Sequence, residues 1–220
     1  MSATVVVFGR EPVPGRVKTR LAAEVGPARA AAVYAALLAH TLEQAQHSGL
    51  DAVLALAEPA SAAWRPPASV PVEVQTGGDL GARMAASFAR HFRRGAETVV
   101  LVGSDCPYLL ASHLRAAAAA CLAVDVVLGP ALDGGYWLLG QRAPGADLFT
   151  GVPWSSPLTL DATRGRLAAL GVSHRELESL RDVDDSSGLD SALSLTGAAP
   201  GVREAMRRAL LDPGVPGGRR

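Results

Sequence analysis

Short runs of apolar and β-branched residues alternate along this chain with longer segments rich in alanine, leucine and arginine. The short runs have the length of buried strands, and the longer segments have the length and periodicity of helices. This alternation predicts βαβ units and a mainly parallel sheet, and therefore an α/β fold. We expect strands over Thr4–Phe8, Asp51–Ala57, Val70–Gln75, Thr98–Val102, Val124–Leu128, Tyr136–Leu139 and Val172–Leu177. We expect helices over Pro27–Gln46, Leu80–Arg94, Ala111–Leu122, Thr159–Leu170, Leu189–Leu195 and Val202–Leu211.

No internal repeat and no low-complexity linker interrupts this alternation. The 220 residues suffice for one large domain and are too few for two ordinary ones. We therefore expect a single domain over residues 1–211. The segment 212–220 is rich in proline, glycine and arginine, which predicts a disordered tail.

Charge and cysteine content narrow the class of protein. Lys and Arg together number 21, as do Asp and Glu, so the formal net charge is zero. A nucleic-acid-binding surface needs clustered positive charge, and we expect no such partner. Cys106 and Cys121 match no zinc or disulfide spacing and suit a reducing cytoplasm. The chain starts without a signal-peptide pattern, and no apolar stretch approaches the ~20 residues that span a bilayer, so we expect a cytoplasmic protein without a membrane partner.

The first loop of chemical interest, Gly9–Leu21, follows the first predicted strand. It contains two glycines, two prolines and four cations, namely Arg10, Arg16, Lys18 and Arg20. Glycines let backbone N–H groups approach an anion, and the N-terminus of a following helix adds a favourable dipole. The alternative is a solvated basic loop. We expect contacts to nucleotide phosphates from Phe8, Gly9, Arg10, Gly15, Lys18 and Arg20.

A second loop, Gln75–Met84, carries the double glycine Gly77-Gly78, which suggests close approach of a ligand to the backbone. Thr76 or Asp79 could instead cap the helix that follows. The residues expected to contact the nucleotide here are Gln75, Gly78, Asp79 and Arg83.

The strand over Thr98–Val102 ends in Gly103-Ser104-Asp105-Cys106-Pro107. In open α/β sheets, ligands bind beyond the carboxyl ends of the strands, where a carboxylate can hold a divalent cation against phosphate oxygens. We therefore predict that Asp105 binds Mg²⁺ or Mn²⁺ and that Ser104 lies by the phosphates. The structural alternative is that Asp105 caps the next helix.

A single carboxylate needs a second metal ligand, and the acidic run Arg181–Asp185 offers one. Asp184 is our first choice and Asp182 the next, ahead of Asp185. The run could equally cap a helix that starts near Ser186.

Two further loops suggest an acceptor site. Asp133-Gly134-Gly135-Tyr136 follows another predicted strand and combines a carboxylate for hydroxyl groups, open glycines and an aromatic wall. An ordinary turn is the alternative. Trp154, in a loop of proline and serine, is either a lid over the site or a plug over the core. We expect substrate contacts from Asp133, Gly134, Gly135, Tyr136 and Trp154.

Together, these segments carry a resemblance to one bacterial family. In chain order they are Phe8–Arg10, Pro14–Leu21, Gly77–Met84, Gly103–Pro107, Leu128–Tyr136 and Pro153–Ser155. The chain resembles the DUF2064 family, which is assigned to the glycosyltransferase-A superfamily. Some members of the DUF2064 family are named arsenosugar-biosynthesis glycosyltransferase or selenodomain-associated transferase. The resemblance implies the nucleotide-diphospho-sugar transferase (GT-A) fold, a three-layer sandwich of a mostly parallel sheet with helices on both faces.

The resemblance also implies an enzyme: a metal-dependent transferase that moves a sugar from a nucleotide sugar to a small-molecule acceptor. On this view Asp105, Asp133 and Lys18 are catalytic, and Asp105 and Asp184 bind the metal. A monomer or a homodimer would suit this function.

Two alternatives remain open. The run Lys18–Leu21 is similar to the first loop of sugar-phosphate nucleotidyltransferases and of phospholactate guanylyltransferase, which favours nucleotidyl transfer from an NTP to a phosphorylated small molecule. Glycosyltransferases of the superfamily typically have an Asp-x-Asp motif, whereas the corresponding stretch Gly103-Ser104-Asp105 has only one carboxylate, with Ser104 beside it. This departure leaves a non-catalytic, nucleotide-binding regulatory domain as the second alternative.

Overall fold

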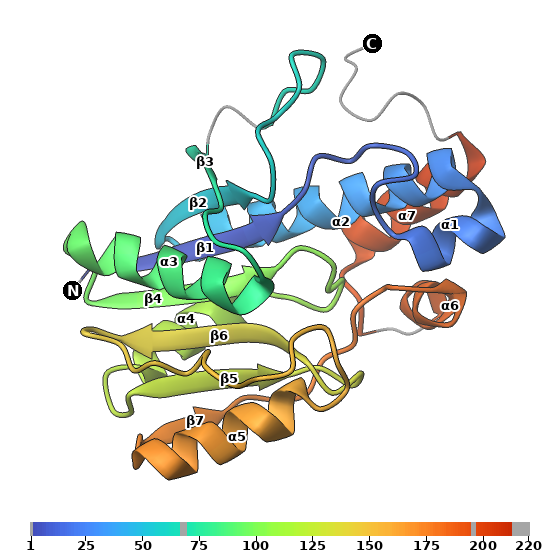
Figure 1. Cartoon of the computed structure of the whole chain (residues 1–220). Helices are drawn as coiled ribbons and strands as arrows, with labels where there is room; N and C mark the ends of the chain where they lie inside the picture. The colour runs from blue at the N-terminus through green and yellow to red at the C-terminus, as the bar shows by residue number, and fades with distance from the viewer. Residues whose placement is uncertain (1, 67–69, 195–196, 213–220) are drawn as a thin grey trace.

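The computed structural model of the chain describes residues 2–66, 70–194 and 197–212. In this part of the chain, a seven-stranded sheet has the order β3-β2-β1-β4-β6-β5-β7 (Figure 1). β6 is antiparallel to its neighbours β4 and β5, and the other neighbouring pairs are parallel. The predicted mostly parallel α/β sheet is therefore confirmed. The strands are β1 (Ala3–Gly9), β2 (Asp51–Leu56), β3 (Val72–Val74), β4 (Thr98–Gly103), β5 (Val126–Pro130), β6 (Tyr136–Arg142) and β7 (His174–Glu176).

Helices cover both faces of the sheet, because alternate side chains of each buried strand point to opposite faces. Val5 and Val7 of β1 pack in one apolar cluster with α2 (Pro27–His47) and α4 (Ala111–Ala120). Val6 and Phe8 pack in a second cluster with α3 (Leu80–Arg93) and α5 (Thr159–Leu170). In Figure 1, α3 and α5 lie in front of the sheet, with α2 and α4 behind it. The result is the expected three-layer sandwich.

Three more helices pack beside α2 in a third apolar cluster. These are α1 (Thr19–Val25), α6 (Ser186–Ser194) and α7 (Pro200–Leu211), which contribute Leu21, Leu189 and Met206 respectively. Figure 1 shows them together at one end of α2. Helices from the start and the end of the chain therefore share one core.

The predicted helices and strands are found with small shifts at their ends, but one helix was missed. α1 lies partly within the predicted loop Gly9–Leu21. Lys18 precedes α1 in the left-handed backbone conformation, with φ of 46° and no side-chain cap, so no ordinary start signal marks the helix.

The helix and tail predicted near the C-terminus can be compared with the structure only over the described residues. α6 begins at Ser186, three residues before its predicted start, and the predicted last residue, Leu195, lies outside the described residues. Asp212 caps α7, and the rest of the predicted tail, 213–220, also lies outside them. Within the described ranges, no helix is long and apolar enough to cross a bilayer.

Candidate active site

A cleft of about 770 Å³ opens at the carboxyl ends of β1 and β4. These strands are parallel neighbours, so the residues that follow them meet at the same edge of the sheet. The cleft is lined by Phe8, Gly9, Arg10, Arg16, Val17, Lys18, Thr19, Arg20, Tyr34, Ala57, Gln75, Gly78, Leu80, Arg83, Gly103, Ser104, Asp105, Ser155 and Asp184. The structure thus brings the first three predicted loops and the acidic run to one cavity.

The cation-rich loop supplies much of this lining. Arg10, Arg16, Lys18 and Arg20 all face the cleft, as do Phe8 and Gly9 at the end of β1. Gly15, which we also predicted as a phosphate contact, does not line the cleft. Its positive φ of 79° is one that glycine adopts without strain, so its role in the structure is to form the turn.

Lys18 lies at the centre of the charged groups. Its ammonium is 2.9 Å from Oδ2 of Asp105 and 2.6 Å from Oδ1 of Asp184, and its side chain is only 6% exposed. Burial by itself would lower the pKa of Lys18, but the charges of both aspartates outweigh burial and raise this pKa above its usual value. Lys18 is therefore a charged ammonium held between two carboxylates.

Three carboxylates gather around this point. Asp105, Asp182 and Asp184 each offer an oxygen, and these oxygens lie within 4.8 Å of one another. The backbone N–H of Val183 donates to the carbonyl oxygen of Asp105 over 3.0 Å, which ties the acidic run to the end of β4. Burial, followed by the charges of the other two carboxylates, raises the pKa of Asp182 to about 7. We call these three residues the acidic triad.

The acidic triad fits a hard divalent cation, because Mg²⁺ and Mn²⁺ prefer oxygen ligands such as carboxylates. Asp184 was our predicted second ligand, and Asp182 was the next choice. Asp185 has the structural role of the alternative interpretation: its carboxylate accepts a hydrogen bond of 2.8 Å from the N–H of Gly188 in the first turn of α6.

Tyr34 is a site residue that the sequence analysis missed. Its hydroxyl accepts a hydrogen bond of 2.8 Å from the backbone N–H of Arg10 and lies 2.9 Å from the hydroxyl of Ser104. It thereby links the end of β1 to the end of β4. The available signal was a single tyrosine in the alanine-rich segment of α2, since a buried tyrosine hydroxyl usually has a polar partner.

The second predicted loop also reaches the cleft. Gln75, Gly78 and Arg83 line it, but Asp79 does not. The carboxylate of Asp79 accepts a hydrogen bond of 2.7 Å from the N–H of Ala82 and caps α3. Asp79 thus has the capping role that the sequence left open.

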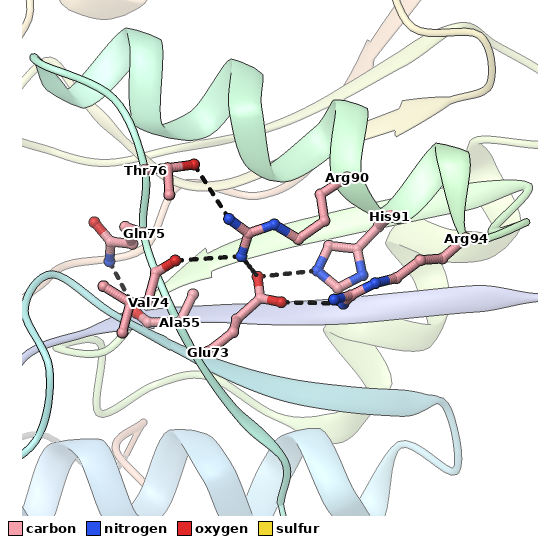
Figure 2. A network of polar contacts seen from close by, with 8 residues as sticks. All are labelled: Ala55, Glu73, Val74, Gln75, Thr76, Arg90, His91 and Arg94. Carbon is pink, nitrogen blue, oxygen red and sulfur yellow. Dashed lines mark hydrogen bonds and ion pairs between the residues drawn. The ribbon is translucent and has the colours of Figure 1, made fainter.

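A network of polar contacts holds this second loop against α3 (Figure 2). Glu73 pairs with Arg90 at 3.0 Å and with Arg94 at 3.1 Å, and it lies 3.2 Å from His91. Arg90 also donates to the hydroxyl of Thr76 over 3.1 Å. Just beyond, the side-chain amide of Gln75 donates to the carbonyl of Ala55 over 2.8 Å, which leaves its own carbonyl for the cleft.

The five residues predicted for the acceptor lie outside the cleft lining. The carboxylate of Asp133 is exposed and accepts a hydrogen bond of 2.9 Å from the N–H of Gly135. Its negative charge contributes to the raised pKa of Asp182, after burial and the charges of Asp105 and Asp184. Gly134 packs closely against Pro157.

Trp154 closes the core rather than the cleft. A Cβ atom on Gly81 would lie 2.2 Å from Nε1 of Trp154, so the indole covers the start of α3. Tyr136 meets it edge-on, with the ring centroids 6.4 Å apart. Of the two roles that the sequence left open, the plug is the one observed. The next residue, Ser155, lines the cleft with a positive φ of 56°, and sequence reasoning did not assign it a site role.

Solved structures show which class of proteins shares this fold. A protein from Desulfovibrio desulfuricans G20, provisionally described as a nucleotide-diphospho-sugar transferase, is 28% identical, with a TM-score of 0.86 over 96% of this chain and 97% of that one. Rv0371c from Mycobacterium tuberculosis H37Rv, solved with manganese, is 22% identical, with a TM-score of 0.51 over 86% and 97%. The inositol-1-phosphate CTP transferase from T. maritima is 11% identical, with a TM-score of 0.56 over 94% and 96%. The fold is that of nucleotide-using transferases.

Within this class, the chain belongs to the DUF2064 family, described as uncharacterized protein conserved in bacteria. The sequence profile of that family matches residues 38–156, which is more than half of the chain. The resemblance stated from the sequence is thereby confirmed. No curated protein matches the chain.

Proposed function

We propose that this protein is a metal-dependent transferase that takes a sugar from a nucleotide sugar and passes it to a small-molecule acceptor. One observation carries the proposal: the cation-rich loop and two carboxylates of the acidic triad line a single cleft at the carboxyl edge of the sheet. Five lining side chains are basic, Arg10, Arg16, Lys18, Arg20 and Arg83, whereas only two, Asp105 and Asp184, are acidic. Such a balance suits a polyanionic ligand.

Phosphate binding is the task of the basic side chains. Arg10, Lys18 and Arg20 would clamp the donor phosphates, since fixed positive charge stabilises the negative charge that develops on a leaving phosphate. Phe8, Gly9, Gln75, Gly78, Arg83 and Ser104 complete the proposed nucleotide contacts.

The acidic triad would hold Mg²⁺ or Mn²⁺. When bound, such an ion neutralises charge on the phosphates of the leaving group. The manganese in the structure of Rv0371c, a protein of the same fold, supports this assignment. Lys18, which contacts two of these carboxylates, would add a further positive charge beside the phosphates.

The acceptor would approach from the side of Asp133. Because this carboxylate is exposed and its charge is felt at the acidic triad, it can orient an acceptor hydroxyl toward the donor. Gly134 and Gly135 complete the proposed acceptor contacts, with Gly134 packed against Pro157, while Tyr136 and Trp154 form the packed wall behind this loop.

The charge balance of the cleft also favours a second candidate, nucleotidyl transfer from an NTP to a phosphorylated small molecule. Five basic and two acidic side chains leave an excess of three positive charges in the cleft lining, whereas the diphosphate of a nucleotide sugar carries two negative charges. A triphosphate would use more of this excess. The CTP transferase of the same fold supports this candidate.

Calorimetry with UDP, GDP, UTP and GTP, each with and without Mn²⁺, tests nucleotide binding. We expect Mn²⁺-dependent binding that Asp105→Asn weakens by about 100-fold, because it removes a charged ligand from the triad. The matched control is Asp185→Asn, which changes an acidic residue outside the triad and keeps a good helix cap. It should bind within about threefold of the wild type. A nucleotide affinity that changes neither with Mn²⁺ nor with Asp105→Asn would contradict the proposal.

Turnover then separates the candidates. Release of a nucleoside diphosphate from a nucleotide sugar supports glycosyl transfer. Release of pyrophosphate from an NTP, in the presence of a phosphorylated acceptor, supports nucleotidyl transfer. Tight binding without consumption of any donor would instead support the regulatory domain that the sequence left open.

A further inference from the structure

The cation held by the acidic triad in this structure is the side chain of Lys18. Its ammonium contacts Asp105 at 2.9 Å and Asp184 at 2.6 Å, and both carboxylates belong to the set that would bind a divalent ion. An ammonium donates its N–H groups to carboxylate oxygens, which are also the ligands of Mg²⁺ and Mn²⁺. Lys18 and the metal ion would therefore bind the same carboxylate oxygens.

The backbone at Lys18 is held in place, whereas its long side chain can change conformation. Val17 and Leu21, on either side, are buried in two different apolar clusters, at 4% and 0% exposure. Lys18 itself has the left-handed conformation, which an L-residue keeps only when the surroundings hold it there. A lysine has four flexible methylene groups, so its ammonium can move within the cleft while the backbone stays in place.

A bound phosphate in the same cleft could provide another partner for the ammonium of Lys18. Arg10, Arg16 and Arg20 line the cleft together with Lys18 and mark where phosphates would bind. A bound phosphate would offer the ammonium an anion in exchange for the carboxylates. Without phosphate, moving Lys18 away from the triad would leave a buried charge without a partner, which is unfavourable.

We propose that Lys18 competes with the divalent ion for the acidic triad, so that the ion binds tightly only together with nucleotide phosphates that draw Lys18 away. This inference rests on the proposed function and deepens it: the ligand of the cleft is a metal–nucleotide complex, and the metal is not resident in the nucleotide-free protein. By thermodynamic linkage, nucleotide and metal then strengthen each other's binding by the same factor.

Electron paramagnetic resonance of free Mn²⁺ measures metal binding without any need for turnover. We compare the full chain with Lys18→Met, which removes the ammonium and keeps much of the side-chain length. Arg20→Met is the matched control, because it removes a cation of the same loop that faces the same cleft. Each protein is titrated with Mn²⁺ alone, with Mn²⁺ plus UDP and with Mn²⁺ plus UTP, and circular dichroism checks folding. Lys18→Gln is the second neutral variant if Lys18→Met does not fold.

Without nucleotide, we expect Lys18→Met to bind Mn²⁺ at least about tenfold more tightly than the wild type, and Arg20→Met to stay within about threefold. The nucleotide should raise Mn²⁺ affinity strongly in the wild type and less in Lys18→Met. If Lys18→Met binds Mn²⁺ alone no better than the wild type, while the wild type still gains affinity with nucleotide, competition is excluded and the proposed function stands. If neither nucleotide promotes Mn²⁺ binding to any of the proteins, the proposed function fails, and the competition fails with it.

Discussion

At the scale of single residues, Gly134 has no side chain, and this lets the turn that carries Asp133 pack against the backbone of Pro157. Its φ is +90°, and a Cβ atom there would lie 2.1 Å from the carbonyl oxygen of Pro157. Its own carbonyl accepts a hydrogen bond of 2.9 Å from the N–H of Leu160 in α5. The turn that carries Asp133 is therefore fixed onto the start of α5 by backbone contacts that a larger residue would break.

We expect Gly134→Ala to lower the free energy of unfolding by about 2–4 kcal/mol, because alanine would be strained at this φ and would collide with backbone atoms. Gly165→Ala is the matched control. Gly165 lies within α5, and apart from the neighbouring backbone of its own helix nothing lies within 4 Å of its Cβ position, so alanine should stabilise the helix by about 0.5–1 kcal/mol. Urea unfolding measures both, and equal stabilities for the two variants would contradict this account.

At the scale of elements, the edge strand β3 is joined to α3 by the ion pairs of Glu73 (Figure 2). Burial by itself would raise the pKa of Glu73, but hydrogen bonds and charges from His91 and Arg90 outweigh it and lower this pKa to about 2 from an ordinary 4.5. A carboxyl group with a lower pKa in the folded state stabilises that state above the unfolded pKa. This contribution is lost as the pH falls from about 4.5 toward about 2.

We expect Glu73→Gln to lower the free energy of unfolding by about 2 kcal/mol at pH 6, and this difference from the wild type should shrink as the pH approaches 2.5. Urea unfolding of both proteins across this range measures the difference at each pH. Glu58→Gln serves as control, because its ion pair with Arg16 is exposed on both sides and should contribute at most about 1 kcal/mol. If the difference in the free energy of unfolding between Glu73→Gln and the wild type stays constant down to pH 2.5, the low pKa of Glu73 is excluded.

Elements were predictable where local pattern decides the structure. The apolar, β-branched run at Thr98–Val102 has the length of a buried strand, and Leu80–Arg94 has the length of a helix with a glycine just past its end. α1 could not be predicted, because its start depends on a left-handed lysine that tertiary packing holds in place. Asp79 likewise showed its capping role only once the fold fixed its direction.

At the scale of the whole molecule, the site joins parts of the chain that are far apart in sequence. Lys18 and Asp184 are separated by 166 residues, yet their side chains lie 2.6 Å apart. Sequence reasoning placed both in the site, because each follows a predicted strand of one sheet. It gave no pairing between them, since no local pattern encodes a contact over that distance. It also missed Tyr34, which acts from within a helix rather than from a loop.

The third apolar cluster explains how this long-range pair is held. Leu21 of α1 lies near Lys18, Val183 adjoins Asp184, and both side chains belong with Met206 of α7 to this cluster. We therefore expect packing beside α2, outside the cleft, to set the distance between the loop and the acidic run. α7 contributes no lining residue, so we expect it to affect the site through the packing of this cluster.

This argument predicts different consequences for two equally buried residues. Met206 and Leu167 are both 0% exposed, but Leu167 packs in the cluster of α3 and α5. Met206→Ala and Leu167→Ala should each lower the free energy of unfolding by about 2–5 kcal/mol. Only Met206→Ala should also weaken Mn²⁺–UTP binding, by about fivefold, because it loosens the packing of Leu21 and Val183. Calorimetry at a temperature at which circular dichroism shows all proteins folded measures this effect. Equal binding by the two variants would show that the third cluster serves stability alone.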